Sequence, residues 1–195
     1  MEVTGTVRTE SGAPVRGGLL EIWNANHFGR YRHIEDHSGL QLDDNFFGMG
    51  RVLTDDDGNY RFWTISPGAY LARPDIGRWR PKHIHISVSG GSSRLVTQMY
   101  FPDEPNNATD PMAILMGDGF KHNVGKPYGT PDQNVDEGFR FDIVVGGRNA
   151  TFLNEGSGSK GSRYCSTLEP TPCIKIRSGG CARRSLHGPA SNIRV

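Results

Sequence analysis

Two tyrosines and two histidines are the residues of this chain whose types and spacing best suit metal chemistry: Tyr31, Tyr70, His83 and His85. Tyrosine binds a metal ion only as phenolate, and because its free pKa is about 10, a strong Lewis acid must displace the proton. Two phenolate oxygens and two neutral imidazole nitrogens together suit a hard, highly charged ion such as Fe(III) better than a softer ion. If the four side chains converge in the fold, they form a ferric iron site.

The two histidines lie in an apolar, β-branched run that predicts a strand over residues 83–89. Because side chains alternate along a strand, His83 and His85 project from the same face and Ile84 projects from the opposite one. A strand is therefore sufficient to present two imidazoles together.

None of these residues indicates a metal site by itself. Two histidines on one strand are equally typical of surface histidines or hydrogen-bonded core histidines. Tyr31 is compatible with a core aromatic, and Tyr70 with an aromatic lid or a hydroxyl that hydrogen-bonds. His33, two residues after Tyr31, competes for the role of ligand. Only the joint pattern favours a metal site.

Short strands separated by turn residues must position these side chains. Strands are predicted over residues 3–8, 19–23, 51–54, 60–65, 83–89, 95–101 and 139–145. The Asp57-Gly58 pair predicts that the strands over residues 51–54 and 60–65 form a hairpin. Regular spacing of this kind predicts an all-β fold, a β-sandwich with little helix. Residues 25–50 and 102–138 lack strand character and are expected to be long active-site loops, with a short helical turn near residues 112–116.

The chain of 195 residues is long enough for one domain with a sizeable core. We expect residues 1–155 to form a catalytic β-sandwich. Residues 156–195 are expected to be a basic, Gly- and Ser-rich extension, disordered or loosely docked. All three cysteines lie in that extension, and free thiols in a reducing compartment explain them most simply.

The overall charge and hydropathy exclude several functions. A net charge of +1 implies no general attraction to nucleic acid or membrane, and no apolar run approaches the length of a membrane span. The first residues carry neither a basic stretch nor an apolar signal core, so the expected compartment is the cytoplasm.

Over residues 3–155 the chain resembles the intradiol ring-cleavage dioxygenases, most closely their iron-bearing, protocatechuate-cleaving subunits. The resemblance rests on the intervals from Tyr31 to Tyr70 and from Tyr70 to His83, and on motifs at residues 3–7, 20–26, 29–33, 45–46, 50–51, 54–55, 58–60, 64–68, 97–101 and 139–144. It implies Fe(III) bound by Tyr31, Tyr70, His83 and His85, together with a solvent hydroxide. In this family Tyr70 would be the axial ligand that leaves when substrate binds, opposite His85. Tyr31 and His83 would be equatorial.

The resemblance also implies that Arg80 stabilises a carbanion-like state of the bound substrate with a fixed positive charge. The alternative is a surface arginine in a salt bridge with Asp75 or another acid. For Gln98, a hydrogen-bonding role around the site and a structural role are equally compatible with the sequence. The expected substrates are O2 and a catechol of the protocatechuate kind, cleaved between its two hydroxylated carbons to a cis,cis-muconate-type diacid without an organic cofactor.

Where the family has a pocket aromatic, this chain has Ala72, which makes room and leaves the ring substituent open. The chain starts at the first core strand, so we expect the family's N-terminal region to be absent. A homo-oligomer or a pairing with a related subunit is the expected assembly. Two other functions are considered: a non-catalytic β-sandwich module, and an Fe(II) enzyme with a two-His-one-carboxylate set. The tyrosines argue against the second.

Overall fold

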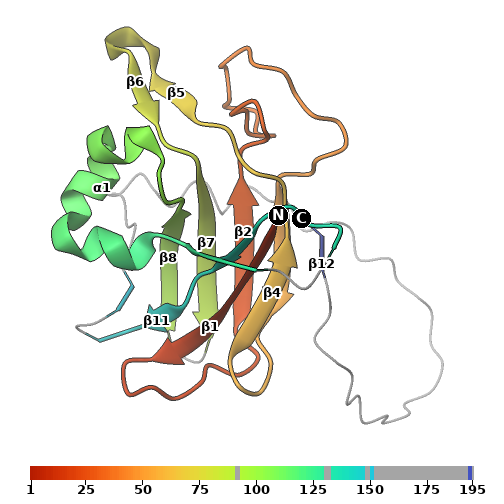
Figure 1. The fold of residues 1–195 in the computed structure, drawn as a ribbon, viewed down its shortest axis with the longest axis vertical. Coiled ribbons are helices and arrows are strands. Elements are labelled where there is room, and N and C mark those ends of the chain that lie inside the picture. The colour runs from red at the N-terminus through yellow and green to blue at the C-terminus, as the bar shows by residue number, and fades with distance from the viewer. Residues whose placement is uncertain (91–92, 130–132, 148–149, 152–192, 195) are drawn as a thin grey trace. The chain divides into compact units, whose positions relative to one another are not determined.

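Two β-sheets face each other across a shared apolar core in the computed structural model (Figure 1). The structure describes residues 1–90, 93–129, 133–147, 150–151 and 193–194. The first sheet has the order β12-β4-β1-β10-β9, and β11 also pairs with β1. Its strands are β1 (Glu2–Thr9), β4 (Asn59–Trp63), β9 (Lys126–Tyr128), β10 (Gly138–Arg140), β11 (Ile143–Val145) and β12 (Ile193–Arg194).

The second sheet has the order β3-β2-β7-β8 and carries the histidines. Its strands are β2 (Leu19–Asn24), β3 (Met49–Leu53), β7 (His83–Gly90) and β8 (Ser93–Tyr100). A separate hairpin pairs β5 (Tyr70–Arg73) with β6 (Arg78–Arg80) around a short 3-10 turn, η1 (Pro74–Ile76). The segment after β8 contains η2 (Pro105–Thr109), α1 (Pro111–Met116) and η3 (Gly117–Asn123).

Alternating side chains build the core. On β7, Ile84, Ile86 and Val88 are at most 1% exposed and belong to the same apolar cluster as Val3 and Phe62 of the first sheet. Burial of one strand face on each sheet is the main favourable term for such a sandwich. The predicted all-β sandwich with little helix is confirmed, as is the helical turn near residues 112–116.

The predicted hairpin around Asp57-Gly58 is wrong. The turn forms, with the Gly58 amide donating to the Asp55 carbonyl at 3.0 Å, but β3 and β4 lie in different sheets. The Gly58 carbonyl accepts a hydrogen bond from the Val7 amide at 2.8 Å, and β4 pairs antiparallel with β1. A local turn signal gives no information about this long-range pairing, and the segment crosses from one sheet to the other.

Two further differences concern short strands. The strand predicted over residues 139–145 is divided into β10 and β11 at Asp142, whose carboxylate accepts hydrogen bonds from the Thr6 amide and hydroxyl and so replaces a ladder contact. The short strands β5, β6 and β9 were not predicted, because each has only three or four residues.

Part of the expected extension is described. Ile193 and Arg194 form β12, which pairs parallel with β4, and the rest of residues 156–195, cysteines included, lies outside the described residues. Along the described part of the chain, no helix is long and apolar enough to cross a membrane.

Candidate metal centre

The register of the second sheet puts the histidines among aromatic and polar neighbours. His85 lies opposite Trp23 of β2 on one side and Gln98 of β8 on the other, and His83 lies opposite Tyr100. Because Ile84 faces the core, these five side chains share the other face of the sheet. The Trp23 and His85 rings stack with centroids 4.9 Å apart and an interplanar angle of 3°.

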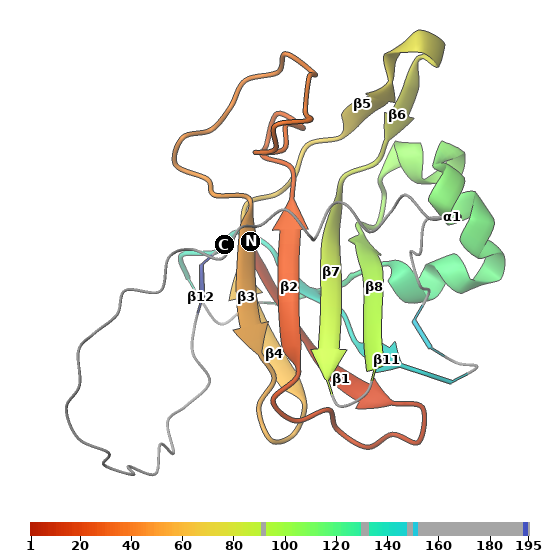
Figure 2. The ribbon, with the colours of Figure 1, turned by 180° about the vertical axis from the view of Figure 1, so that it is seen from behind.

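Tyr31 belongs to the loop after β2, and Tyr70 is the first residue of β5. Both segments lie at the end of the sheet where β2 and β8 end and β7 begins (Figure 2). The Gly68 amide donates to the Asn26 carbonyl at 2.9 Å, which joins the loop before Tyr70 to the loop before Tyr31. A Cβ at Gly68 would overlap the His27 carbonyl, so only glycine permits this approach.

Further hydrogen bonds fix the loop that carries Tyr31. The Asn26 side-chain oxygen accepts from the amides of Phe28 and Arg30, both at 2.9 Å, and Asn26 is 2% exposed. The Tyr31 amide donates to the Asp36 carboxylate at 2.7 Å. As a result, the Tyr31 and Tyr70 rings meet edge to face with centroids 5.4 Å apart.

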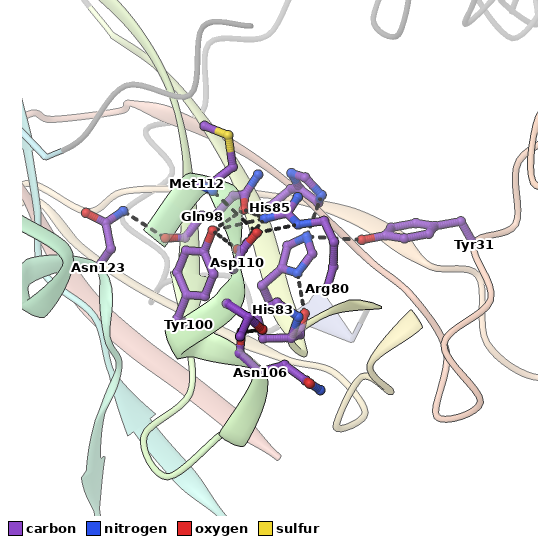
Figure 3. Close-up of polar contacts among 12 residues, drawn as sticks. Tyr31, Arg80, His83, His85, Gln98, Tyr100, Asn106, Asp110, Met112 and Asn123 are labelled. Carbon is purple, nitrogen blue, oxygen red and sulfur yellow. Dashed lines mark hydrogen bonds and ion pairs between the residues drawn. The ribbon is translucent and has the colours of Figure 1, made fainter. Parts of the chain in front are cut away.

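The four predicted ligands therefore lie together. The Tyr31 hydroxyl is 3.5 Å from His83 Nε2, and His83 Nε2 is 3.1 Å from His85 Nε2 (Figure 3). The Tyr70 ring centroid is 5.8 Å from that of His83. Two nitrogens bound at about 2.1 Å to one ion at a right angle are about 3 Å apart. The observed nitrogen separation fits a shared metal ion.

The histidines are in the protonation state that a metal requires. His83 Nδ1 lies 2.7 Å from the Pro81 carbonyl, and because that oxygen can only accept, Nδ1 carries the hydrogen and Nε2 keeps its lone pair. Burial, and then the charge of Arg80, lower the pKa of His83 to about 3. Burial, then the neighbouring His83, lower the pKa of His85 well below its usual range. Both imidazoles are neutral at physiological pH.

The two tyrosines, unlike the histidines, must lose a proton before they can bind a metal ion. Burial and then the nearby Tyr70 raise the pKa of Tyr31 well above its usual range. Burial also raises the pKa of Tyr70, although Arg80 opposes this effect. Without a strong Lewis acid both phenols stay protonated, so the donor set suits a hard trivalent ion. Among the described residues, no group of three or more His, Cys, Asp or Glu side chains is arranged to hold a metal ion.

Arg80 does form a salt bridge with an acid, but that acid is not Asp75, and the Arg80 side chain is only 15% exposed and not at the surface. Asp75 binds Arg73 on the hairpin, whereas Arg80 forms an ion pair with Asp110 at 2.9 Å. Arg80 is also the cross-strand partner of Tyr70, and its Nη2 donates to the Gln98 side-chain oxygen at 2.8 Å. Arg80 and Gln98 thus both border the cluster.

Comparison with known proteins identifies the family of this chain. A dioxygenase family model matches residues 1–147. The chain is 46% identical over 153 residues to the protocatechuate 3,4-dioxygenase beta chain of Burkholderia cepacia, covering 76% of this chain and 65% of the relative. The chain belongs to the intradiol ring-cleaving dioxygenases.

Two further matches have lower identity. This dioxygenase chain is 34% identical over 118 residues to the chlorocatechol 1,2-dioxygenase of Rhodococcus opacus, covering 54% of this chain and 44% of the relative. It superposes on a solved structure of catechol 1,2-dioxygenase from Acinetobacter sp. ADP1 with a TM-score of 0.58 at 28% identity, covering 74% of this chain and 51% of that one. The chain thus spans roughly half to two thirds of the length of these proteins.

Within the dioxygenase chain, sequence reasoning missed Tyr100 and Asp110. Tyr100 is two residues after Gln98 on β8, so strand alternation could have placed it on the same face. Asp110 comes from the loop before α1 and has no local signal for its contact with Arg80. His33, the competing candidate, is exposed, and its Nδ1 accepts from the Glu35 amide at 3.0 Å.

Proposed function

We propose that this chain is the iron-bearing catalytic part of a non-haem Fe(III) dioxygenase that cleaves a catechol between its two hydroxylated carbons with O2. The observation that carries the proposal is the meeting of two tyrosine and two histidine side chains in a member of this family. Tyr31, Tyr70, His83 and His85 would hold the ion. We further propose that residues 1–155 form the catalytic β-sandwich, in agreement with the family match over residues 1–147, and that residues 156–195 are an extension.

When bound, Fe(III) would draw electron density from the chelated ring and make it reactive toward O2. The residues of the chain would accept a substrate proton and balance the charge of the site. Tyr70 Oη would accept one of the two phenolic protons of a catechol, and a solvent hydroxide would accept the other, so that the substrate would bind as a dianion. Two anionic groups, the Tyr70 phenolate and the hydroxide, would thus be exchanged for one dianion, and the charge of the buried site would stay nearly constant. The neutral imidazoles of His83 and His85 keep their lone pairs throughout.

Arg80 would act as a fixed cation. Arg80 is the cross-strand partner of Tyr70, and its charge opposes the rise in the pKa of the Tyr70 phenol. Negative charge that develops on the substrate near Tyr70 would therefore be stabilised by Arg80. Gln98, which is 1% exposed and bonded to Arg80, would border the same space.

A catechol of the protocatechuate kind is the proposed substrate, supported by the identity to the protocatechuate 3,4-dioxygenase beta chain. Pairing with a related subunit, as the name of that relative suggests, or a homo-oligomer would complete the assembly. The cytoplasm is the proposed compartment.

The test starts from iron-loaded protein. Tyrosinate bound to ferric iron gives a visible charge-transfer band, so the wild-type protein should be red-brown and should convert catechols to muconate-type diacids. A yellow semialdehyde product would instead indicate cleavage beside the diol. Colourless, iron-free protein after iron-supplemented expression would favour a non-catalytic module.

Ligand assignment is tested by iron content. His83→Ala and His85→Ala should each lose iron, whereas His33→Ala, an exposed histidine outside the cluster, should retain it. Full iron occupancy in both of the first two variants would contradict the proposed ligand set.

A further inference from the structure

Asp110 holds the Arg80 guanidinium by two parallel hydrogen bonds. Arg80 Nε lies 3.1 Å from Asp110 Oδ1, and Nη2 lies 2.9 Å from Oδ2. The Asp110 side chain is 0% exposed and that of Arg80 is 15% exposed. Such bidentate pairs fix the plane of the guanidinium as well as neutralising its charge.

Tyr100 closes the same network. Its hydroxyl is 3.0 Å from Arg80 Nη2, 2.8 Å from the Gln98 side-chain oxygen and 2.9 Å from Asp110 Oδ2 (Figure 3). A hydroxyl has one proton, so it donates to one of the last two groups and accepts from Arg80. Because a carboxylate is the stronger acceptor, Asp110 is the favoured partner of the hydroxyl proton; one Nη2 hydrogen is directed at Asp110 Oδ2, and the second is shared between the Tyr100 oxygen and the Gln98 side-chain oxygen.

The network leaves one edge of the guanidinium unused. Nε and Nη2 are committed to Asp110, Gln98 and Tyr100, whereas Nη1 forms no hydrogen bond to any residue that the structure describes. Arg80 is the cross-strand partner of Tyr70, on the side of the ligand cluster. The clamp therefore determines which N–H groups of Arg80 are free to meet a substrate.

Asp110 itself is held in place by the start of α1. Its Oδ1 accepts from the Met112 amide at 3.4 Å, and its own amide donates to the Asn107 carbonyl at 3.4 Å. The Asn107 side chain in turn donates to the Phe101 carbonyl at 2.9 Å, next to the end of β8. The carboxylate thus comes from a segment tied to the same strand that carries Tyr100.

We propose that Asp110 and Tyr100 are positioning residues that lock the Arg80 guanidinium in one orientation, with its Nη1 edge directed at the reacting substrate. This inference rests on the proposed function. Neither residue would touch the substrate, and both act through Arg80. If Asp110 is replaced by a neutral residue, the Arg80 guanidinium keeps its charge but loses the partner that fixes its plane. A misplacement of about 1 Å in a catalytic group costs on the order of 100-fold in rate.

Asp110→Asn is the decisive variant, because asparagine has nearly the same shape and still caps α1 through Oδ1, while it lacks the charge and the second acceptor. We expect kcat to fall by about 10- to 100-fold, with KM changed by less than about 3-fold and iron content unchanged. Tyr100→Phe should show the same pattern with a smaller loss. Asp75→Asn, which breaks the exposed Arg73–Asp75 pair, is the matched control and should leave kcat unchanged.

A double-mutant cycle separates positioning from a general structural role. In an Arg80→Gln background, Asp110→Asn should reduce kcat by less than about 2-fold further, because its effect requires Arg80. An equal loss in both backgrounds, or an unchanged kcat in the single variant, would overturn the inference.

The third readout does not depend on activity. In metal-free protein, solvent exchange of the Arg80 Nε–H followed by 15N NMR, with the signal assigned from Arg80→Gln, should be at least about 10-fold faster in Asp110→Asn than in wild type. Unchanged exchange would also overturn the inference. An inactive, iron-free wild-type protein with the expected exchange difference would refute the proposed function alone and leave the clamp of Arg80 intact.

Discussion

In metal-free protein, the free energy of unfolding should decrease as the pH falls from about 7 to 4.5. Burial, and then Arg80, lower the pKa of His83 to about 3, against an ordinary value of about 6.5 in the unfolded chain. Below that ordinary value the unfolded state binds more protons than the folded state. The free energy of unfolding therefore decreases with falling pH, at up to about 1.4 kcal/mol per pH unit for each such histidine.

The size of the effect follows from His83 alone. Between pH 6.5 and 4.5 the difference in proton binding amounts to about 2 kcal/mol. His85, whose pKa is lowered in the same direction, adds to it. Carboxylates with lowered pKa, such as Asp36 and Asp142, act in a different range. Their stabilisation is present above about pH 4 and is lost only below it, so the window isolates the histidines.

The assay is urea unfolding of chelator-treated protein, followed by tryptophan fluorescence at several pH values between 7 and 4.5. His83→Gln is the matched variant, because glutamine can still donate to the Pro81 carbonyl but does not titrate. Its free energy of unfolding should fall by about 2 kcal/mol less across the window. A flat profile in the wild-type protein, or the same fall in His83→Gln, would refute the claim that a buried, neutral His83 resists protonation.

Three further outcomes are expected. Tyr70→Phe should retain iron, slow turnover by at least about 10-fold because one proton acceptor is lost, and shift the visible band; an unchanged spectrum would exclude Tyr70 as a ligand. Trp23→Leu removes the ring that stacks on His85 and should weaken iron affinity by about 10-fold in a chelator competition; unchanged affinity would show that the stacking is not needed. Gly68→Ala should lower the melting temperature and iron content together, because its Cβ overlaps the His27 carbonyl; wild-type values for both would refute the close approach.

Local patterns were sufficient for the histidine pair. His83 and His85 share a face because alternation along a strand depends only on neighbouring residues, and the burial of Ile84 follows from the same rule. The seven predicted strands and the short helical turn likewise depend on short-range propensity. The four ligand candidates could be chosen from residue type and family resemblance, because their chemistry belongs to the side chains themselves.

Only the tertiary structure decided how distant segments meet. Tyr31 and Tyr70 approach each other because the loops before them pack together through Gly68 and Asn26. The partner of Arg80 is Asp110, 30 residues away, and not the nearby Asp75. The turn at Asp57-Gly58 connects β3 and β4, which lie in different sheets and do not form a hairpin. Each outcome depends on contacts between residues far apart in the chain. The free energies of such contacts cannot be predicted from a local sequence pattern.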